Sequence, residues 1–399
     1  MAEAFAKAAP FAWYEVRRLL AAITTLEVMV LVAIMLVASV PPQGWAAVAT
    51  HTMATAEDLD ASMSAGQDFG RRRGRGRRRR ELYHVDVTEA GQPCVPSPLW
   101  DRVVDPANYD YGCREIQSMI LAGNKTLVGS GRVRDVYLVE YGGRKVALKT
   151  LRDMDENKSQ QAHLDKHRRE ILTLDAMRGH QNIVPMLGLC DTIVVTEYHT
   201  TSLLRAIFRG RMELPDLAIV SMALDAARGL QVLHEVAGAI HVDLKPQQLL
   251  IDDYGRVMLN DFNSAHIMSV SQAGDGAVCP TQSNKRNLPT PWPSPENYAG
   301  EPLTPASDIY SLGMIFFSIM AGSLPYEGNE ERLARAMSTR GRPEIDPSWH
   351  KGFMKVVEDM WHQIPQKRPS AKRVVVRLEI IQAEIFSETA QASQWDGTK

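Results

Sequence analysis

Two aspartates on either side of a short apolar hairpin are the residues of this 399-residue chain best suited to chemistry. Asp243 stands two residues before Lys245, and Asp261 is followed by Phe262. One carboxylate beside a lysine, with a second that can hold a divalent cation, suits transfer of a metal-bound phosphoryl group. Each pair alone is common in loops, so the prediction depends on their order and spacing.

The chain around the two aspartates predicts the elements that position them. Residues 249–251 and 256–259 are short apolar segments, and the Asp-Asp-Tyr-Gly between them at 252–255 has a turn composition, so we expect a strand, a tight turn and a second strand. Upstream of His241, apolar residues recur three or four apart and predict a buried helix: Ile219, Met222, Ala223, Ala226, Leu230 and Leu233.

Further strands are predicted earlier in the chain. Residues 125–128 and 136–139 have strand character, and the turn between them contains Gly129-Ser130-Gly131. Two more glycines at 142 and 143 make a tight hairpin into residues 145–149, which end on a lysine. Glycines let backbone amides approach phosphate groups closely, and the lysine would hold phosphates as a point charge.

Together, these motifs resemble a protein kinase domain over about residues 109–385. The resemblance implies the fold class α+β: a bilobal protein kinase fold with a small five-stranded β lobe that carries one helix and a larger α-helical lobe. It also implies that ATP, with Mg²⁺ or Mn²⁺, binds between the lobes. We expect the kinase domain at 109–388 and a C-terminal tail at 389–399.

The resemblance also implies residue roles. Asp243 would act as base or orienting group for the substrate hydroxyl, and Lys245 would contact the transferred phosphoryl group. Asp261 and Gln248 would hold the metal ion. The residues expected to bind the nucleotide or to position its lysine are Leu127, Gly129, Gly131, Val136, Ala147, Lys149, Glu170, Glu197, His199 and Leu250.

Contacts that support the site are implied as well. The expected contacts are Lys149 with Glu170, Glu296 with Arg368, Asp308 with the catalytic loop, and His241 with Phe262. The glutamate–arginine contact would be a buried bidentate pair that fixes the activation segment at 264–295. Asp308 would also serve as a helix cap, since Asp is a favoured capping residue.

Four positions depart from the family pattern. Arg134 replaces the third glycine of the phosphate-covering loop, which should make the loop stiffer and more polar. Val242 replaces an arginine that in many kinases receives a phosphate on the activation segment, so activity should depend little on phosphorylation there. Gln248 replaces a metal-binding asparagine and sets its carbonyl one methylene further out. Asn263 replaces the glycine that follows Asp-Phe, and Asn tolerates left-handed backbone conformations.

The sequence therefore favours a protein kinase that transfers the γ-phosphoryl group of ATP to a hydroxyl of a protein substrate. A lysine two residues after Asp243 resembles the pattern of serine/threonine kinases, whereas Trp292 resembles the pattern of tyrosine kinases. Serine or threonine is mildly favoured as the acceptor residue. The departures support an alternative, a pseudokinase that binds nucleotide or partners as a signalling scaffold. Retention of Lys149, Asp243 and Asp261 favours the enzyme.

The chain before the kinase-like region divides into three parts. Residues 1–18 form a flank, residues 19–40 are an apolar run with Glu27 as the single charge, and residues 41–108 have no hydrophobic period. The run is long enough to cross a membrane, and we prefer a retained single-pass anchor to a cleaved signal peptide or a buried helix. Residues 41–108 are predicted to be a disordered, Arg-rich linker.

The arginine run at 71–80 is interpreted as a solvated linker or as a contact to anionic lipid. Nucleic acid or a processing protease are further alternatives, although no specific nucleic-acid partner is expected. Arg17 and Arg18 favour a cytoplasmic N-terminus, whereas the arginine run favours the cytoplasm for the other side of the anchor. The topology of the membrane protein is therefore left open, and the net charge of −2 says nothing about partners.

The chain has four cysteines, which are too few for a disulfide scaffold: Cys94, Cys113, Cys190 and Cys279. They lack C-x-x-C spacing, which argues against structural zinc. If the anchor places the kinase domain outside the cytoplasm, an oxidising compartment would permit a bridge between Cys94 and Cys113. Two free thiols are the alternative.

Overall fold

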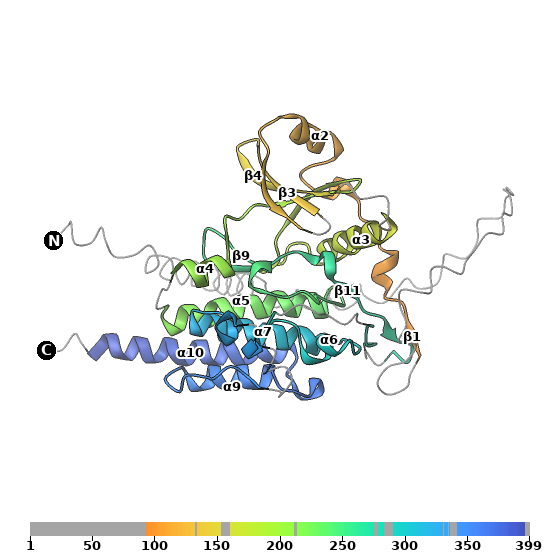
Figure 1. Ribbon diagram of the computed structural model, residues 1–399. Helices are drawn as coiled ribbons and strands as arrows, with labels where there is room; N and C mark the ends of the chain where they lie inside the picture. Colours follow the sequence, from red (N-terminus) through yellow and green to blue (C-terminus); the bar gives the residue numbers. More distant parts are fainter. Residues whose placement is uncertain are drawn as a thin grey trace, which may run out of the picture. The chain divides into compact units, whose positions relative to one another are not determined.

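A computed structural model describes the chain from Pro93 to Trp395, with short gaps (Figure 1). The described residues are 93–131, 134–152, 160–210, 214–274, 278–282, 290–329, 331–333, 335 and 341–395. The predicted flank at 1–18, the predicted anchor at 19–40 and the arginine run at 71–80 lie outside them. Among the residues that are described, no helix is long and apolar enough to cross a membrane.

The first part of the described chain forms a five-stranded antiparallel sheet in the order β2-β3-β4-β6-β5. Its strands are β2 (Thr126–Ser130), β3 (Arg134–Tyr141), β4 (Arg144–Leu151), β5 (Met186–Cys190) and β6 (Ile193–Glu197). Gly142 and Gly143 join β3 to β4 with φ of 59° and 78°. Both lie in the left-handed region that a two-residue hairpin turn requires, which explains the two glycines.

Two helices accompany this sheet, α2 (Cys113–Leu121) and α3 (Gln160–Ala176). The resemblance implied one helix in the small lobe, and the helix that carries Glu170 is α3. The additional helix α2 was not expected, so the expectation of a single helix is wrong. Glu115 accepts a hydrogen bond from the Gly112 backbone at 3.0 Å and so caps the start of α2. Ile116 and Met119 of α2 are fully buried against Val139 and other sheet residues, and this packing stabilises a helix of only nine residues.

The second part of the chain is mainly helical, as expected (Figure 1). Its helices are α4 (Leu203–Gly210), α5 (Asp216–Glu235), α6 (Pro295–Ala299), α7 (Pro305–Ala321), α9 (Lys351–Met360) and α10 (Ala371–Trp395). The apolar faces of α5, α7, α9 and α10 share one buried cluster. Because α10 continues to Trp395, the predicted tail at 389–399 is helical over its described residues. The bilobal α+β prediction is confirmed.

Short strands surround the loop that carries Asp243. They are β7 (Thr201–Ser202), β8 (Ala239–Ile240), β9 (Leu249–Ile251), β10 (Val257–Leu259), β11 (His266–Ile267) and β12 (Val270–Ser271). The predicted hairpin is present as antiparallel β9 and β10, with Leu249 opposite Leu259. Since β8 pairs with β11, the chain entering the loop is tied to the chain leaving the hairpin.

The segment before Tyr109 belongs to the fold, which corrects the predicted linker boundary at 108. Strand β1 (Cys94–Val95) pairs antiparallel with β12, and two short 3-10 helices follow at Pro98–Asp101 and Pro106–Asn108. Arg102 then forms an ion pair with Asp175 of α3. These contacts join the segment to both parts of the fold. The lack of a hydrophobic period therefore did not mean that this segment lacks structure.

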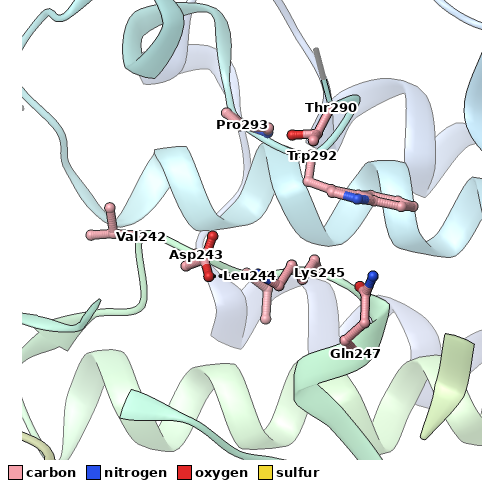
Figure 2. Close-up of a pocket in the computed structure, with 8 residues that line it drawn as sticks. All are labelled: Val242, Asp243, Leu244, Lys245, Gln247, Thr290, Trp292 and Pro293. Carbon is pink, nitrogen blue, oxygen red and sulfur yellow. Dashed lines mark hydrogen bonds and ion pairs between the residues drawn. The ribbon is translucent and has the colours of Figure 1, made fainter. Parts of the chain in front are cut away.

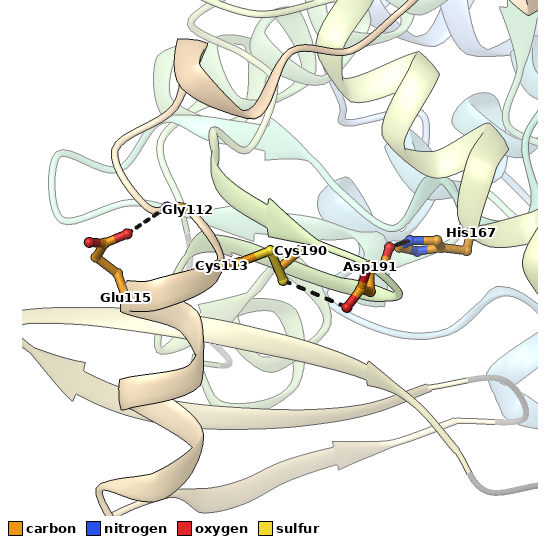
Figure 3. The surroundings of a disulfide bond; sticks show 6 residues. All are labelled: Gly112, Cys113, Glu115, His167, Cys190 and Asp191. Carbon is orange, nitrogen blue, oxygen red and sulfur yellow. Dashed lines mark hydrogen bonds between the residues drawn. A yellow bond between two sulfur atoms is a disulfide. The ribbon is translucent and has the colours of Figure 1, made fainter.

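All four cysteines are paired, so both alternatives for Cys94 and Cys113, a bridge between them and two free thiols, are wrong. Cys94 is bonded to Cys279, and Cys113 is bonded to Cys190. Figure 3 shows the second bridge, which joins the first residue of α2 to the last residue of β5. The pairing follows from strand and helix contacts between distant segments, because the partners are 185 and 77 residues apart.

Candidate active site

The loop that carries Asp243 is held by the buried carboxylate of Asp308. That carboxylate accepts hydrogen bonds from the backbone N–H groups of His241 at 2.7 Å and Val242 at 2.9 Å. It also contacts His234 Nε2 at 3.0 Å. Burial raises the pKa of Asp308, but the hydrogen bond and charge of His234 outweigh burial and hold it below the ordinary value. Asp308 thus anchors the loop, as predicted, and the residue at the N-cap of α7 is Thr304.

Val242 has a left-handed backbone with φ of 68°. This conformation is costly for a β-branched residue, so it needs support from its surroundings. The two bonds to the Asp308 carboxylate supply that support on one side. On the other side, His241 Nε2 lies 3.1 Å from the Asn260 carbonyl, and its ring lies 5.5 Å from that of Phe262, as expected.

Beyond this turn, Asp243 and Lys245 lie at the wall of a cavity of about 180 Å³. Lys245 Nζ donates to Asp243 Oδ2 at 2.7 Å, and both side chains are partly exposed. Figure 2 shows that Thr290, Trp292 and Pro293 of the following segment lie across from them. A hydroxyl group entering this cavity would meet a carboxylate and an ammonium group together.

The segment opposite the catalytic loop is fixed by a buried ion pair. Both Nη atoms of Arg368 bind the Glu296 carboxylate, at 2.7 and 3.0 Å, and Ser307 donates to the same carboxylate at 2.9 Å. Burial raises the pKa of Glu296, but its bonds to Arg368 outweigh burial and lower it. The predicted bidentate pair is therefore present, and it places Trp292 beside the cavity.

Lys149 connects three elements above the catalytic loop. It lies on β4, and its Nζ is 3.1 Å from Glu170 Oε1 on α3 and 3.0 Å from Asn260 Oδ1. Glu170 is 0% exposed. Burial raises the pKa of its carboxyl, but the charges of Lys149 and Arg134 outweigh burial and hold it below its ordinary value. The predicted lysine–glutamate pair is present, and it reaches the residue before Asp261.

The sequence did not predict where the side chain of Arg134 lies. Instead of making the loop more polar, its side chain is buried, and its Nε lies 2.8 Å from Glu170 Oε2. Its Nη2 lies 2.5 Å from His167 Nδ1. An arginine at the position where the resemblance implied a glycine was the only sign of this in the sequence. The direction of the side chain depends on how β3 and α3 meet.

Asp261 and Gln248 lie together at the end of the β9–β10 hairpin. Gln248 Nε2 donates to Asp261 Oδ2 at 2.9 Å, and Asp261 has φ of 64°. Burial raises the pKa of the Asp261 carboxyl. A carboxylate and an amide oxygen from Gln248 are hard donors, which suit Mg²⁺ or Mn²⁺. Asn263, in contrast, is not among the residues with positive φ, so the missing glycine imposes no strain there.

The expected nucleotide-binding residues occupy the sheet, the end of β6 and β9. Gly129 lies opposite Val136 in the β2–β3 pair, and Ala147 lies opposite Thr196 in the β4–β6 pair. Leu127 and Gly131 lie in and just after β2, Glu197 ends β6, and Leu250 lies in β9. His199 follows Glu197, and their side chains are 3.7 Å apart. Leu250 belongs to a separate three-stranded sheet in the order β10-β9-β7.

Comparison with known proteins identifies the family. A family model described as the protein kinase domain matches residues 123–377, more than half of the chain. The chain belongs to the protein kinase family. The match contains the lysine–glutamate pair, the catalytic loop and the β9–β10 hairpin, so the kinase fold and the site geometry agree.

The curated relatives include kinases from Dictyostelium discoideum and Arabidopsis thaliana. A probable serine/threonine-protein kinase from Dictyostelium discoideum is 31% identical over 255 residues, which covers 62% of this chain and 26% of that protein. Serine/threonine-protein kinase 12 from Arabidopsis thaliana is 29% identical and is covered over 52% of its length. The serine/threonine/tyrosine-protein kinase HT1 from the same plant is 28% identical and is covered over 66%. The chain thus spans from about a quarter to two thirds of these relatives.

Proposed function

We propose that this chain is an active protein kinase, which transfers the γ-phosphoryl group of ATP to a hydroxyl of a protein substrate. The observation that carries the proposal is the Lys149–Glu170 pair at 3.1 Å. The pair is formed in the same structure that places Asp243 and Lys245 at the wall of a cavity. Phosphoryl transfer depends mainly on positioning and charge, and both sets of residues are in place for it.

Each residue of the site then has a defined task. Lys149 would bind the α- and β-phosphates, Asp243 would accept or orient the proton of the substrate hydroxyl, and Lys245 would contact the transferred group. Asp261 and Gln248 would hold the divalent cation, which supplies positive charge next to the phosphate oxygens when bound. The chain itself provides orientation of both substrates.

We further propose serine or threonine as the acceptor. Lys245 supports this choice because it lies within 2.7 Å of Asp243, where it can contact a phosphoryl group on its way to the hydroxyl. The printed names of the relatives include serine/threonine kinases and also kinases of dual specificity. Trp292, which lines the same cavity, is the feature that favours tyrosine.

A second candidate is a pseudokinase that binds nucleotide or partners. The observation that favours it is the bond from Gln248 Nε2 to Asp261, since it presents an amide N–H rather than an oxygen to the carboxylate. Rotation of the amide by half a turn restores an oxygen ligand, so the same residues remain compatible with a metal.

A transfer assay distinguishes the two candidates. The full chain is incubated with radiolabelled ATP, Mg²⁺ or Mn²⁺ and a mixture of protein substrates, and Asp243→Asn serves as the matched control. We expect incorporation that falls about 100-fold in the control, because positioned base catalysis contributes about that factor or more. Absence of transfer with both metals, together with nucleotide binding that ignores the metal, would favour the pseudokinase.

We also propose that residues 19–40 anchor the chain in a membrane with the kinase domain in an oxidising compartment. The support for this orientation is that all four cysteines are paired, since disulfides persist outside the reducing cytoplasm. The arginine run at 71–80 would then lie on the same side as the domain, which favours a solvated linker over contact with anionic lipid of the cytoplasmic leaflet. Alkaline extraction of membranes tests the anchor, and release of the chain by alkali would contradict it. Protease treatment of intact vesicles tests the orientation, and digestion of the kinase domain would contradict it.

A further inference from the structure

The buried side chain of Arg134 links the end of the phosphate-covering loop to α3. It extends from the first residue of β3, where Arg134 lies opposite Leu151 of β4, and it is only 4% exposed. Its Nε contacts Glu170 at 2.8 Å, its Nη2 contacts His167 at 2.5 Å, and its Nη1 lies 3.4 Å from the carbonyls of Lys149 and Thr192. Protein groups thus surround the guanidinium, and its Nε meets Glu170 Oε2 as an ion pair without the geometry of a hydrogen bond.

We propose that Arg134 is a positioning residue, which holds Glu170, and through it Lys149, in the arrangement that binds nucleotide phosphates. The proposal deepens the proposed kinase function and rests on it. Arg134 does not contact the reacting atoms in this role, because its three nitrogen atoms are directed at β4, α3 and the turn between β5 and β6.

The electrostatic reason lies in the burial of Glu170. A buried carboxylate is stable only when it is paired, and removal of one partner of a buried pair is costly. Lys149 alone would have to satisfy Glu170 and bind phosphates at the same time. With Arg134 on Oε2 and Lys149 on Oε1, one partner stays with the carboxylate while the other serves the nucleotide. The three groups together carry one net positive charge, which favours a phosphate ligand.

His167, three residues before Glu170 on the same face of α3, connects Arg134 to the turn between β5 and β6. Its Nε2 lies 2.7 Å from the Asp191 carbonyl, which can only accept a hydrogen bond. Nε2 therefore carries the proton, and in the neutral ring Nδ1 is the acceptor that Arg134 requires. Burial, and next the charge of Arg134, lower the pKa of His167 and keep the ring neutral.

The turn that carries Asp191 is itself fixed by a disulfide. Asp191 follows Cys190, which is bonded to Cys113 at the start of α2, and Figure 3 shows His167 reaching the Asp191 carbonyl beside this bridge. A continuous set of contacts thus runs from the disulfide through His167 and Arg134 to Glu170. In this arrangement α3 is tied to the sheet by the chain's own residues.

The test compares three variants of the full chain. Arg134→Met removes the charge but keeps an unbranched side chain in the buried space, and Arg134→Lys keeps the charge without the planar fork. Arg114→Met makes the same change at an exposed arginine of α2, whose side chain is 91% exposed. Measurements are kcat, KM for ATP, the dissociation constant of a non-hydrolysable ATP analogue, and amide hydrogen exchange of α3.

We expect Arg134→Met to lower kcat/KM for ATP about tenfold or more, which corresponds to about 1.4 kcal/mol of lost transition-state stabilisation. It should also weaken analogue binding and speed exchange in α3, with Arg134→Lys intermediate and Arg114→Met unchanged. If Arg134→Met lowers only the melting temperature while kinetic constants, analogue binding and α3 exchange stay at the starting values, the residue is merely structural and the proposal fails. Because analogue binding and exchange need no phosphoryl transfer, they decide the point even if the unmodified chain proves inactive.

Discussion

At the scale of single residues, the site holds two non-glycine residues in left-handed backbone conformations. Val242 and Asp261 have φ of 68° and 64°, and such conformations cost about 1–3 kcal/mol each. Asp308 supports the first through the backbone bonds described above, and Gln248 contacts the carboxylate of the second at 2.9 Å. The catalytic groups are thus positioned before substrate arrives, and loss of a supporting side chain should affect both stability and activity.

The metal preference should follow the side chain at position 248. Mg²⁺ requires near-ideal octahedral geometry, so a longer amide stem should penalise Mg²⁺ more than Mn²⁺. We expect faster transfer with Mn²⁺ than with Mg²⁺, no transfer by Asp261→Ala, and a shift toward Mg²⁺ in Gln248→Asn. Initial rates with each metal check this, and an unchanged preference in Gln248→Asn would show that Gln248 is not a ligand.

Asp308 should contribute stability that depends on pH. Its pKa in the folded chain lies below the ordinary 3.8, so its contribution is fully present above about pH 3.8 and is lost as pH falls through the lower folded value. Asp308→Asn should lower the free energy of unfolding near neutral pH by about 2 kcal/mol, because hydrogen bonds to a charged group are lost. Urea titrations from pH 6 to about pH 3 measure the difference. A difference that does not shrink at low pH contradicts the assignment.

At the scale of elements, the activation segment is held by contacts that do not involve phosphate. Strand β12 pairs with β1, Cys279 is bonded to Cys94, and Glu296 is bound by Arg368. At the position where the resemblance to kinases implied an arginine that receives a phosphate, this chain has Val242. A disulfide, a strand pair and an ion pair thus hold the described parts of the segment and its end.

Activity should therefore survive removal of phosphate. Without the arginine, a phosphate on the activation segment has no partner at position 242, so its loss changes little. We expect protein treated with phosphatase to retain most of its initial rate, with untreated protein incubated in the same buffer as the control. Abolition of activity by the phosphatase, and recovery after incubation with ATP, would overturn the prediction.

At the scale of the whole molecule, the compact unit that contains the kinase domain begins at Arg79, and its described residues begin at Pro93. The segment from 93 to 108 joins the activation segment through β1 and reaches α3 through Arg102. The segment therefore contacts both parts of the fold, although it lies before the residues that match the kinase family model.

A chain that starts at Tyr109 should be less stable than one that starts at Arg79. The shorter chain lacks Cys94, and loss of a native disulfide typically costs about 2–5 kcal/mol. Urea unfolding of both chains measures this difference. The longer chain with Cys94→Ser and Cys279→Ser is the control that separates the bridge from the contact of Arg102 with Asp175. Equal midpoints for all three would show that the segment does not stabilise the domain.

Features that depend on neighbouring residues could be predicted from the sequence. The β9–β10 hairpin, the Gly142-Gly143 turn and α5 follow from turn composition and hydrophobic period, which act over a few residues. The turn predicted at 129–131 is wrong in part, because Gly129 and Ser130 belong to β2 and pair with β3. The pairing of Lys149 with Glu170, and of Glu296 with Arg368, was predicted because their motifs stood in the order of the kinase family. The predicted anchor at 19–40 remains a prediction, since it lies outside the described residues.

Which distant segments meet depends on the packing of the whole domain. The direction of Arg134 depends on how β3 packs against α3, and no local pattern encodes that geometry. The partners of Cys94 and Cys113 depend on the pairing of β1 with β12 and on the docking of α2 against β5. Four cysteines allow three pairings, and sequence alone cannot choose among them, because the choice is made by the packing that brings two thiols within bonding distance.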